Sequence, residues 1–214
     1  MRLHHSLQQI LAPAYPCPEF SGSCAREMHW NPSVGHVPRG FAGATGGTDE
    51  VELVLVVAEP GEPDPARDNF EGDHLDLVYR DTMKSLEVGR DQFHRNVQFI
   101  LNRCWPSLSF AEQMRKVWFT ESVLCSAQQS AGPVSPSASN ACGRRYLLAQ
   151  LAYFPQALVV ALGTKAKNRL ERVGVQNFYS AFAVGRPGCN HRGARPSWEG
   201  IAVELARRRT QRHA

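Results

Sequence analysis

The chain has 214 residues, of which 43% are hydrophobic and 21% are charged. This ordinary composition excludes a disordered, fibrous or coiled-coil chain, and the length predicts one domain, residues 1–214, around one core. Lys and Arg exceed Asp and Glu by 24 − 20 = 4, which permits an anionic partner. The apolar runs fall short of the roughly 20 residues of a membrane span, and the first residues lack the apolar core of a secretory signal. We therefore expect a cytoplasmic monomer that does not bind membranes.

Residues 1–48 are rich in Pro and Gly and are expected to form loops. Four short apolar runs then predict strands of a parallel sheet that is covered on both faces, at residues 51–58, 117–123, 157–162 and 181–184. Helical patterns alternate with them, at residues 73–86, 90–104, 140–154, 164–173 and 197–209. This alternation predicts an α/β fold with a mainly parallel sheet.

Ligands of such sheets bind at the edge formed by the carboxyl ends of the strands. The segments to inspect are therefore residues 59–70, 121–130, 163–167 and 185–195. The Gly-rich residues 40–47 lack a Gly-Lys-Ser/Thr ending, so we interpret them as a turn and not as a P-loop. The motifs of zinc proteases, α/β-hydrolases and dinucleotide-binding enzymes are absent from the sequence, which argues against these classes.

Arg is concentrated from residue 186 to the end of the chain, where only two acids, Glu199 and Glu204, accompany it. This end is the expected electropositive surface. The alternative is a solvated helix whose terminal Arg residues complement the helix dipole.

Five motifs follow one another along the chain, and they are Val56-Val-Ala-Glu-Pro-Gly61, Asn69-Phe70-Glu-Gly72, Trp118-Phe-Thr-Glu-Ser-Val-Leu-Cys125, Pro155-Gln-Ala-Leu-Val-Val-Ala-Leu-Gly163-Thr-Lys-Ala166 and Gly185-Arg-Pro-Gly-Cys-Asn-His191. Their order and spacing resemble the uracil-DNA glycosylase superfamily, especially its iron–sulfur branches, from about residue 37 to about residue 201. The resemblance implies a three-layer α/β/α sandwich with a four-stranded parallel sheet. It also implies hydrolysis of the N-glycosidic bond of a base flipped out of DNA.

Glu59 aligns with the superfamily's Asp or Asn that precedes Pro at the end of the first strand. We expect its carboxylate to orient or deprotonate water and to face the positive charge that develops on the sugar. Asp64 is the second candidate for this role. The alternative is that Glu59 is a surface acid in a turn.

Two departures from the family pattern concern the base. Gly61 stands where uracil-specific members carry a Tyr that crowds the fifth carbon of the base, so space is left there. Glu121 follows Thr120 where the family has an Asn, and an ionised carboxylate can accept a hydrogen bond from the amino group of cytosine. Together they suggest a cytosine enlarged at its fifth carbon, as in hypermodified phage DNA. Glu121 could instead be protonated, or form a structural ion pair with an Arg.

Three further roles are implied by the resemblance. Phe70 matches the aromatic residue that stacks on the flipped base, with simple core packing as the alternative. His191 replaces the His of the family's His-Pro-Ser motif as donor to the leaving base, and Arg186 is the alternative donor. The residues expected to contact DNA phosphates are Lys165, Lys167, Arg186, Arg192 and Arg195.

Six Cys in a reducing compartment are not expected to form structural disulfides. Cys125 and Cys142 are 142 − 125 = 17 residues apart, close to the second ligand pair of the iron–sulfur branches. Cys17 and Cys24 would be the first pair, although their separation of 24 − 17 = 7 residues is wider than usual there. These four would hold a structural 4Fe-4S cluster, or a zinc ion as the alternative.

The sequence thus predicts a monofunctional DNA glycosylase whose partner is DNA. One rival is a uracil-DNA glycosylase of base-excision repair. The other is a catalytically silent nucleic-acid-binding module that lost the His-Pro-Ser donor.

Overall fold

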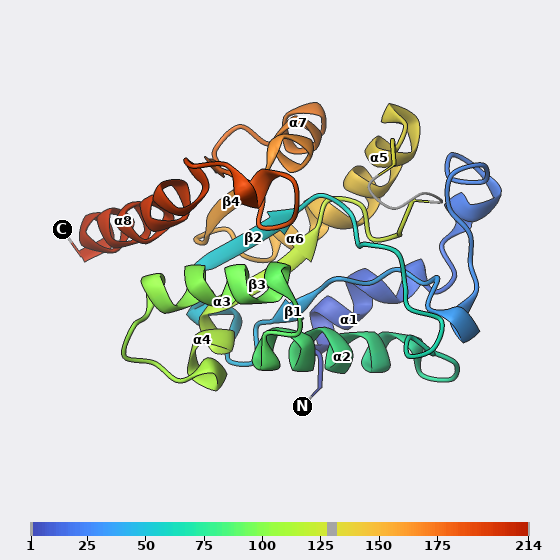
Figure 1. The fold of residues 1–214 in the computed structure, drawn as a ribbon, viewed down its shortest axis with the longest axis horizontal. Coiled ribbons are helices and arrows are strands. Elements are labelled where there is room, and N and C mark those ends of the chain that lie inside the picture. The colour runs from blue at the N-terminus through green and yellow to red at the C-terminus, as the bar shows by residue number, and fades with distance from the viewer. Residues whose placement is uncertain (1, 128–131, 214) are drawn as a thin grey trace.

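A computed structural model describes residues 2–127 and 132–213 of the chain (Figure 1). Its centre is a five-stranded mixed sheet with the strand order β1-β3-β2-β4-β5. The strands are β1 (Ala42–Gly43), β2 (Leu53–Val57), β3 (Val117–Glu121), β4 (Leu158–Leu162) and β5 (Tyr179–Ala181). The four strands β3, β2, β4 and β5 are parallel, whereas β1 runs antiparallel to β3.

The edge strand β1 corrects the prediction of a purely parallel, four-stranded sheet. It lies inside the Gly-rich segment that we interpreted as a turn. Gly43 has φ +95°, and a Cβ atom at this position would lie 2.1 Å from the carbonyl oxygen of Val117. The chain can approach β3 this closely because glycine has no side chain, and this long-range contact has no local signature in the sequence.

The central strands β2 and β3 are buried along their whole length, as their continuous apolar character predicts. The last strand starts two residues before the predicted segment 181–184 and ends at Ala181. Its pairing stops there because the Phe182 N–H donates to Ser197 Oγ (3.0 Å) instead of continuing the ladder.

The α-helices are α1 (His5–Leu11), α2 (His74–Val88), α3 (Gln92–Cys104), α4 (Phe110–Lys116), α5 (Pro136–Cys142), α6 (Leu148–Ala152), α7 (Thr164–Arg172) and α8 (Ala194–His213). Helices α2 to α5 begin after residues whose side chains accept a hydrogen bond from the first turn, namely Asp73, Asp91, Ser109 and Ser135. The predicted helix 140–154 is divided into α5 and α6 by a π-helical turn, Gly143–Leu147.

The helices pack in two groups (Figure 1). Helix α3 packs against α2 and α8, and α8 contacts β4 and β5. In the other group α5 packs against α7, α1 packs against α6, and α7 contacts β4 and β2. The segment predicted to be all loop contains α1, whose Leu7 and Leu11 are fully buried in the core.

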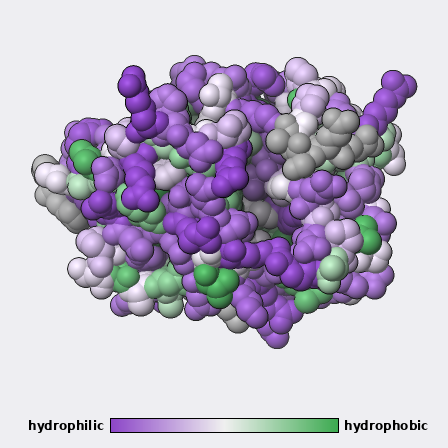
Figure 2. Space-filling model, viewed as in Figure 1, coloured by the Kyte–Doolittle hydropathy of each residue, from purple (hydrophilic) through white to green (hydrophobic). Residues whose placement is uncertain are grey.

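Hydrophilic residues cover most of the face that Figure 2 shows, and hydrophobic residues are scattered over it. Within the described part of the chain, no helix is both long enough and apolar enough to cross a membrane.

A buried polar network ties the helix α6 to the strand β3. Gln150 is fully buried, and its Oε1 accepts hydrogen bonds from Trp118 Nε1 (3.0 Å) and from Thr120 Oγ1 (2.7 Å). Gln150 Nε2 in turn donates to the carbonyl oxygen of Tyr146 (3.2 Å). This network fixes the end of β3, directly before Glu121.

We expect Gln150→Leu to lower the free energy of unfolding by about 2–4 kcal/mol, because two buried donors lose their acceptor. Urea unfolding followed by circular dichroism measures the change. The control is Gln8→Leu on the exposed face of α1, which should change the stability by less than about 0.5 kcal/mol. Equal effects of both substitutions would contradict this account of β3.

Candidate functional site

The candidate site lies at the carboxyl ends of the neighbouring strands β2 and β3. Glu121 is the last residue of β3, it pairs in register with Val57 of β2, and Glu59 follows two residues after Val57. Ser122 Oγ donates to the carbonyl oxygen of Ala58 (2.6 Å) and joins the two strand ends. The parallel register therefore brings the two predicted acids to the same edge of the sheet.

The side chain of Glu59 is only 6% exposed and forms two ion pairs with helix α7. Lys165 Nζ lies 2.5 Å from its Oε1, and Arg169 NH1 lies 2.5 Å from its Oε2. Arg169 is itself 6% exposed, and its NH1 also donates to the carbonyl oxygen of Ala58 (2.6 Å) and to Ser122 Oγ (3.1 Å). The carboxylate is therefore fixed in place and does not point to bulk solvent.

Helix α7 can approach the strand ends because it starts at Gly163. This residue has φ +101°, and a Cβ atom there would lie 2.8 Å from Ala183 Cβ. Sequence reasoning selected Lys165 for DNA contacts and missed Arg169. The signal was present, since residues four apart in a helix lie on the same face, and Arg169 follows Lys165 at that spacing.

Glu121 is buried, with 4% of its surface exposed. Burial raises its pKa well above the usual range, and the charge of Glu59 raises it further, whereas Arg169 and Arg39 lower it by less. Among the described residues, Glu121 Oε2 has no hydrogen-bond partner. The environment thus favours the protonated carboxyl group, one of the states that the sequence leaves open.

Two glycines shape the space around these acids. Gly40 has φ +82°, and a Cβ atom there would lie 2.5 Å from Glu121 Cγ, so any side chain would displace the carboxyl group. Gly61 has open space instead, since its Cβ would meet no heavy atom within 4 Å. The carbonyl oxygen of Gly61 accepts hydrogen bonds from Ser126 Oγ (2.7 Å) and from Arg39.

Phe70 and Asp64 both make contacts within the fold. Phe70 is 4% exposed and belongs to the hydrophobic core, and its N–H donates to the carbonyl oxygen of Pro32 (2.9 Å). Asp64 is exposed, and its Oδ1 accepts a hydrogen bond from the Ala66 N–H (3.1 Å) within a turn.

The last predicted motif lies on the surface before α8. His191 is exposed, its ring stacks on that of Phe182 with centroids 4.5 Å apart, and its Nδ1 accepts from the Gly193 N–H (3.0 Å). Arg186 Nε donates to Gln92 Oε1 (3.0 Å). Both candidate donors for the leaving base, His191 and Arg186, thus interact with other residues at the protein surface.

The remaining predicted DNA-binding residues differ in their contacts. The guanidinium of Arg195 lies 4.9 Å from the centre of the Phe99 ring. Lys167 pairs with Glu171 one turn later in α7 (2.8 Å), and Arg192 is exposed.

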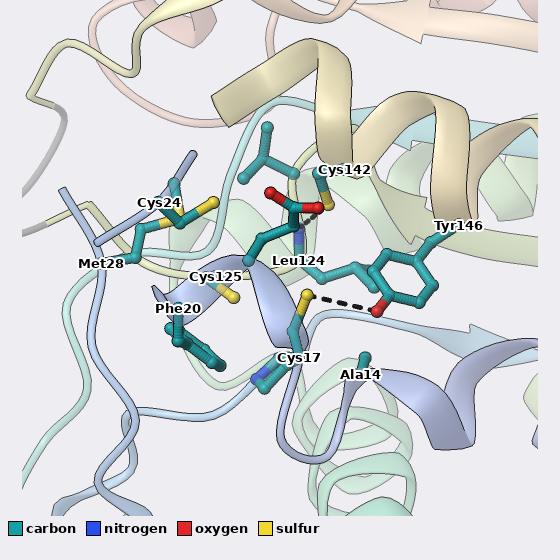
Figure 3. Close-up of a pocket in the computed structure, with 12 residues that line it drawn as sticks. Ala14, Cys17, Phe20, Cys24, Met28, Leu124, Cys125, Cys142 and Tyr146 are labelled. Atoms are coloured by element: carbon teal, nitrogen blue, oxygen red, sulfur yellow. Dashed lines mark hydrogen bonds between the residues drawn. The ribbon is translucent and has the colours of Figure 1, made fainter. Parts of the chain in front are cut away.

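The four predicted cysteine ligands line one cavity (Figure 3). Its volume is about 10 Å³, which is room for roughly one water molecule. Cys17 and Cys24 come from the N-terminal segment, Cys125 from the loop after β3, and Cys142 from the end of α5. Cysteines far apart in the sequence thus line the same cavity, while Cys104 lies elsewhere, at the end of α3.

Burial favours the neutral form of three of these thiols. It raises the pKa of Cys24 to about 11, and the neighbouring Cys17 adds to this shift. It raises the pKa of Cys142 to about 12, where the hydrogen bond from Leu124 N–H opposes the shift and Cys17 and Cys24 add to it. The pKa of Cys125 is raised by burial and then by Cys142, Cys24 and Cys17. Several of them can become thiolates together only if a cation compensates their charge.

The π-helical turn Gly143–Leu147 adds a further contact at this cavity. Tyr146 lies in this turn, and its hydroxyl donates to Cys17 Sγ (3.2 Å) and to the carbonyl oxygen of Pro13 (3.0 Å). Leu124 N–H donates to Cys142 Sγ (3.4 Å). Within residues 2–127 and 132–213, no group of three or more His, Cys, Asp or Glu side chains is arranged to hold a single metal ion.

Comparison with known proteins identifies no relative: no family model matches the chain, and no curated protein matches it.

The raised pKa of Glu121 predicts how stability depends on pH. In the unfolded chain this group ionises near pH 4.3, whereas in the folded protein it stays protonated well above that value. Its contribution to stability is therefore fully present below about pH 4 and is lost as the pH rises toward the folded pKa. We expect Glu121→Gln, which is always neutral, to gain stability relative to the wild type from pH 4 to pH 8.

Urea unfolding of both proteins across this pH range measures the effect. The control is Glu71→Gln, at an exposed position, which should show no such trend. A difference between wild type and E121Q that stays constant with pH would show that Glu121 is ionised in the folded protein.

Proposed function

We propose that the chain is a monofunctional DNA glycosylase. It would hydrolyse the N-glycosidic bond of a flipped-out cytosine-type base with a substituent at its fifth carbon, and leave an abasic site. The observation that carries the proposal is the pair of carboxyl groups at neighbouring strand ends, one ion-paired and one buried without a partner for its Oε2 among the described residues. Pairs of titratable groups in such contrasting environments are typical of acid–base sites.

Glu59 would act on the sugar side of the bond. When the bond to the base lengthens, positive charge grows on the sugar, and a fixed carboxylate stabilises that charge and orients the attacking water. Arg169 would hold the Glu59 carboxylate at the strand ends, because its guanidinium pairs with Glu59 and also donates to the carbonyl oxygen of Ala58. Lys165 is 45% exposed, so a DNA phosphate can compete with Glu59 for its ammonium group.

Other residues would bind the DNA around the flipped nucleotide. The open space at Gly61 would receive the substituent of the base. Arg186, Arg192 and Arg195 lie in or next to the exposed loop before α8, and they would contact phosphates. His191 would have to leave Phe182 before it could reach a base.

The three-layer sandwich is part of this proposal. In the sheet, β3 lies on one side of β2, and β4, the next strand in the sequence, lies on the other side of β2. The connection from β2 to β3 therefore runs in the opposite direction along the sheet to the connection from β3 to β4. With right-handed crossovers, the intervening helices then cover opposite faces. The group of α2 and α3 would form one outer layer, and the group of α5 to α7 the other.

We also propose that Cys17, Cys24, Cys125 and Cys142 hold a structural 4Fe-4S cluster. The donor set fits, since four thiols line one largely apolar cavity. A four-iron cluster would take all four thiolates as ligands, and a zinc ion held by the same four thiolates is the alternative. The cavity would have to widen to hold the cluster, and three of the four ligands lie in turns or loops. Bound there, the cluster would order the loops next to the site.

The glycosylase proposal predicts that the protein converts DNA with 5-substituted cytosine to abasic sites. A panel of oligonucleotides and modified phage DNAs, treated with the protein and scored for abasic sites, tests it. Glu59→Gln should reduce the rate at least about 100-fold, as expected for loss of a catalytic carboxylate, and should leave DNA binding in place.

The matched control is Glu62→Gln, an exposed acid three residues away, which should retain the wild-type rate. Excision of uracil but of no cytosine derivative would favour the base-excision-repair enzyme instead. No excision from any DNA, with DNA binding retained, would favour the silent nucleic-acid-binding module.

The cluster proposal predicts a brown protein with visible absorbance and about equal amounts of iron and sulfide. Cys142→Ser should lose both, because it removes one of the four ligands. Cys104→Ser is the control, since Cys104 and Cys142 are similarly buried, at 7% and 8% exposure, and it should leave the absorbance unchanged. A colourless protein that contains zinc would overturn the assignment.

A further inference from the structure

We propose that Glu121 is the general acid of this site: its buried carboxyl group holds the pairing edge of a cytosine-type base and gives its proton to ring nitrogen N3 as the base leaves. This inference rests on the proposed glycosylase function. It goes beyond that function by naming the group that acts on the leaving base, and it gives a chemical reason for the class of base.

The position of Glu121 carries the inference. Its carboxyl group is buried at the end of β3, and among the described residues its Oε2 has no hydrogen-bond partner. A buried carboxyl oxygen without a partner is costly unless a ligand supplies the missing hydrogen bond. Gly40 packs against the same side chain, and any Cβ there would collide with it. The fold thus keeps this carboxyl group in place, and one of its buried oxygens lacks a hydrogen-bond partner among the described residues, a partner that a bound base would supply.

Three charged groups from separate elements act on Glu121. Glu59 follows β2, Arg169 belongs to α7, and Arg39 precedes β1. Both arginines have other contacts, since Arg169 pairs with Glu59, and Arg39 donates to the carbonyl oxygens of Gly35 and Gly61. Burial, reinforced by the charge of Glu59, outweighs the two cations and raises the pKa of Glu121.

A neutral carboxyl group offers one O–H donor and one carbonyl acceptor side by side. Cytosine offers the complementary pair, because its amino group donates and its N3 accepts. Two parallel hydrogen bonds can therefore form. In uracil N3 carries a hydrogen and cannot accept a proton, so proton transfer to N3 requires a cytosine-type base.

The step balances in protons and electrons. The bond between C1′ and N1 breaks, and its electron pair goes to the base. The proton of Glu121 goes to N3, so the base leaves as a neutral tautomer. Water oxygen forms the new bond to C1′, and its proton goes to Glu59. Glu121 is then ionised and Glu59 protonated, and exchange with solvent restores both.

The variant Glu121→Gln separates binding from proton transfer, because a carboxamide keeps a donor and an acceptor but gives up no proton. On the cytosine derivative that the wild type excises, we expect kcat to fall about 100-fold or more, while KM stays within about threefold. The wild-type rate should fall at high pH as Glu121 ionises, and E121Q should lack this decrease. Glu62→Gln should keep both kcat and the pH profile.

Isotope-edited infrared spectroscopy of the wild type gives a readout that needs no activity. A carbonyl band of a protonated carboxyl group at neutral pH, absent from E121Q, supports the inference, and its absence from the wild type overturns it. An active wild type with an equally fast E121Q overturns the acid role alone. A wild type that excises no base overturns the proposed function itself, and the acid role with it.

Discussion

Helix α7 places positively charged side chains beside the strand ends, where the carboxyl groups of Glu59 and Glu121 both lie. The electrostatics of the candidate site depend on how strongly each carboxyl group interacts with these cations. Glu59 pairs with two cations of that helix, Lys165 and Arg169, by direct contact. Glu121 feels Arg169 only through its field, and burial outweighs that attraction. Two ionised carboxyl groups at neighbouring strand ends would repel each other, and the charge of Glu59 accordingly adds to the rise in the pKa of Glu121. The two Glu side chains thus lie in different electrostatic environments, and the roles proposed for them rest on that difference.

The cysteine cavity and the carboxyl pair are joined by short hydrogen bonds. Ser126 directly follows Cys125 and donates to the carbonyl oxygen of Gly61, and Arg39 donates to the same oxygen. The Arg39 N–H in turn donates to the carbonyl oxygen of Leu124 (2.7 Å). These bonds connect the segment that carries Cys125 to the loop that follows Glu59.

Much of the fold could be predicted because its central strands are short, apolar and buried on both faces, so that local composition identifies them. Features set by contacts between distant residues could not. The edge strand β1 depends on how closely Gly43 approaches Val117, and no local pattern encodes that distance. The same holds in the candidate site. Glu59 and Glu121 could be predicted because each lies at or after the end of a predicted strand. The contact of Arg169 with Glu59 could not, because it depends on the path of the chain at Gly163, directly before α7.

The Arg-rich end of the chain shows why charge counted along a sequence differs from charge at a surface. Arg207 and Arg208 both pair with Glu204, and the hydrogen bond from Arg207 is the main cause that lowers the pKa of this acid to about 2. Arg209 pairs with Glu52, which precedes β2 at the amino end of the sheet. These three arginines are thus compensated within the fold and fit the solvated-helix alternative. At the opposite edge of the sheet, exposed positive charge is found on Lys165 and on Arg192 in the loop before α8.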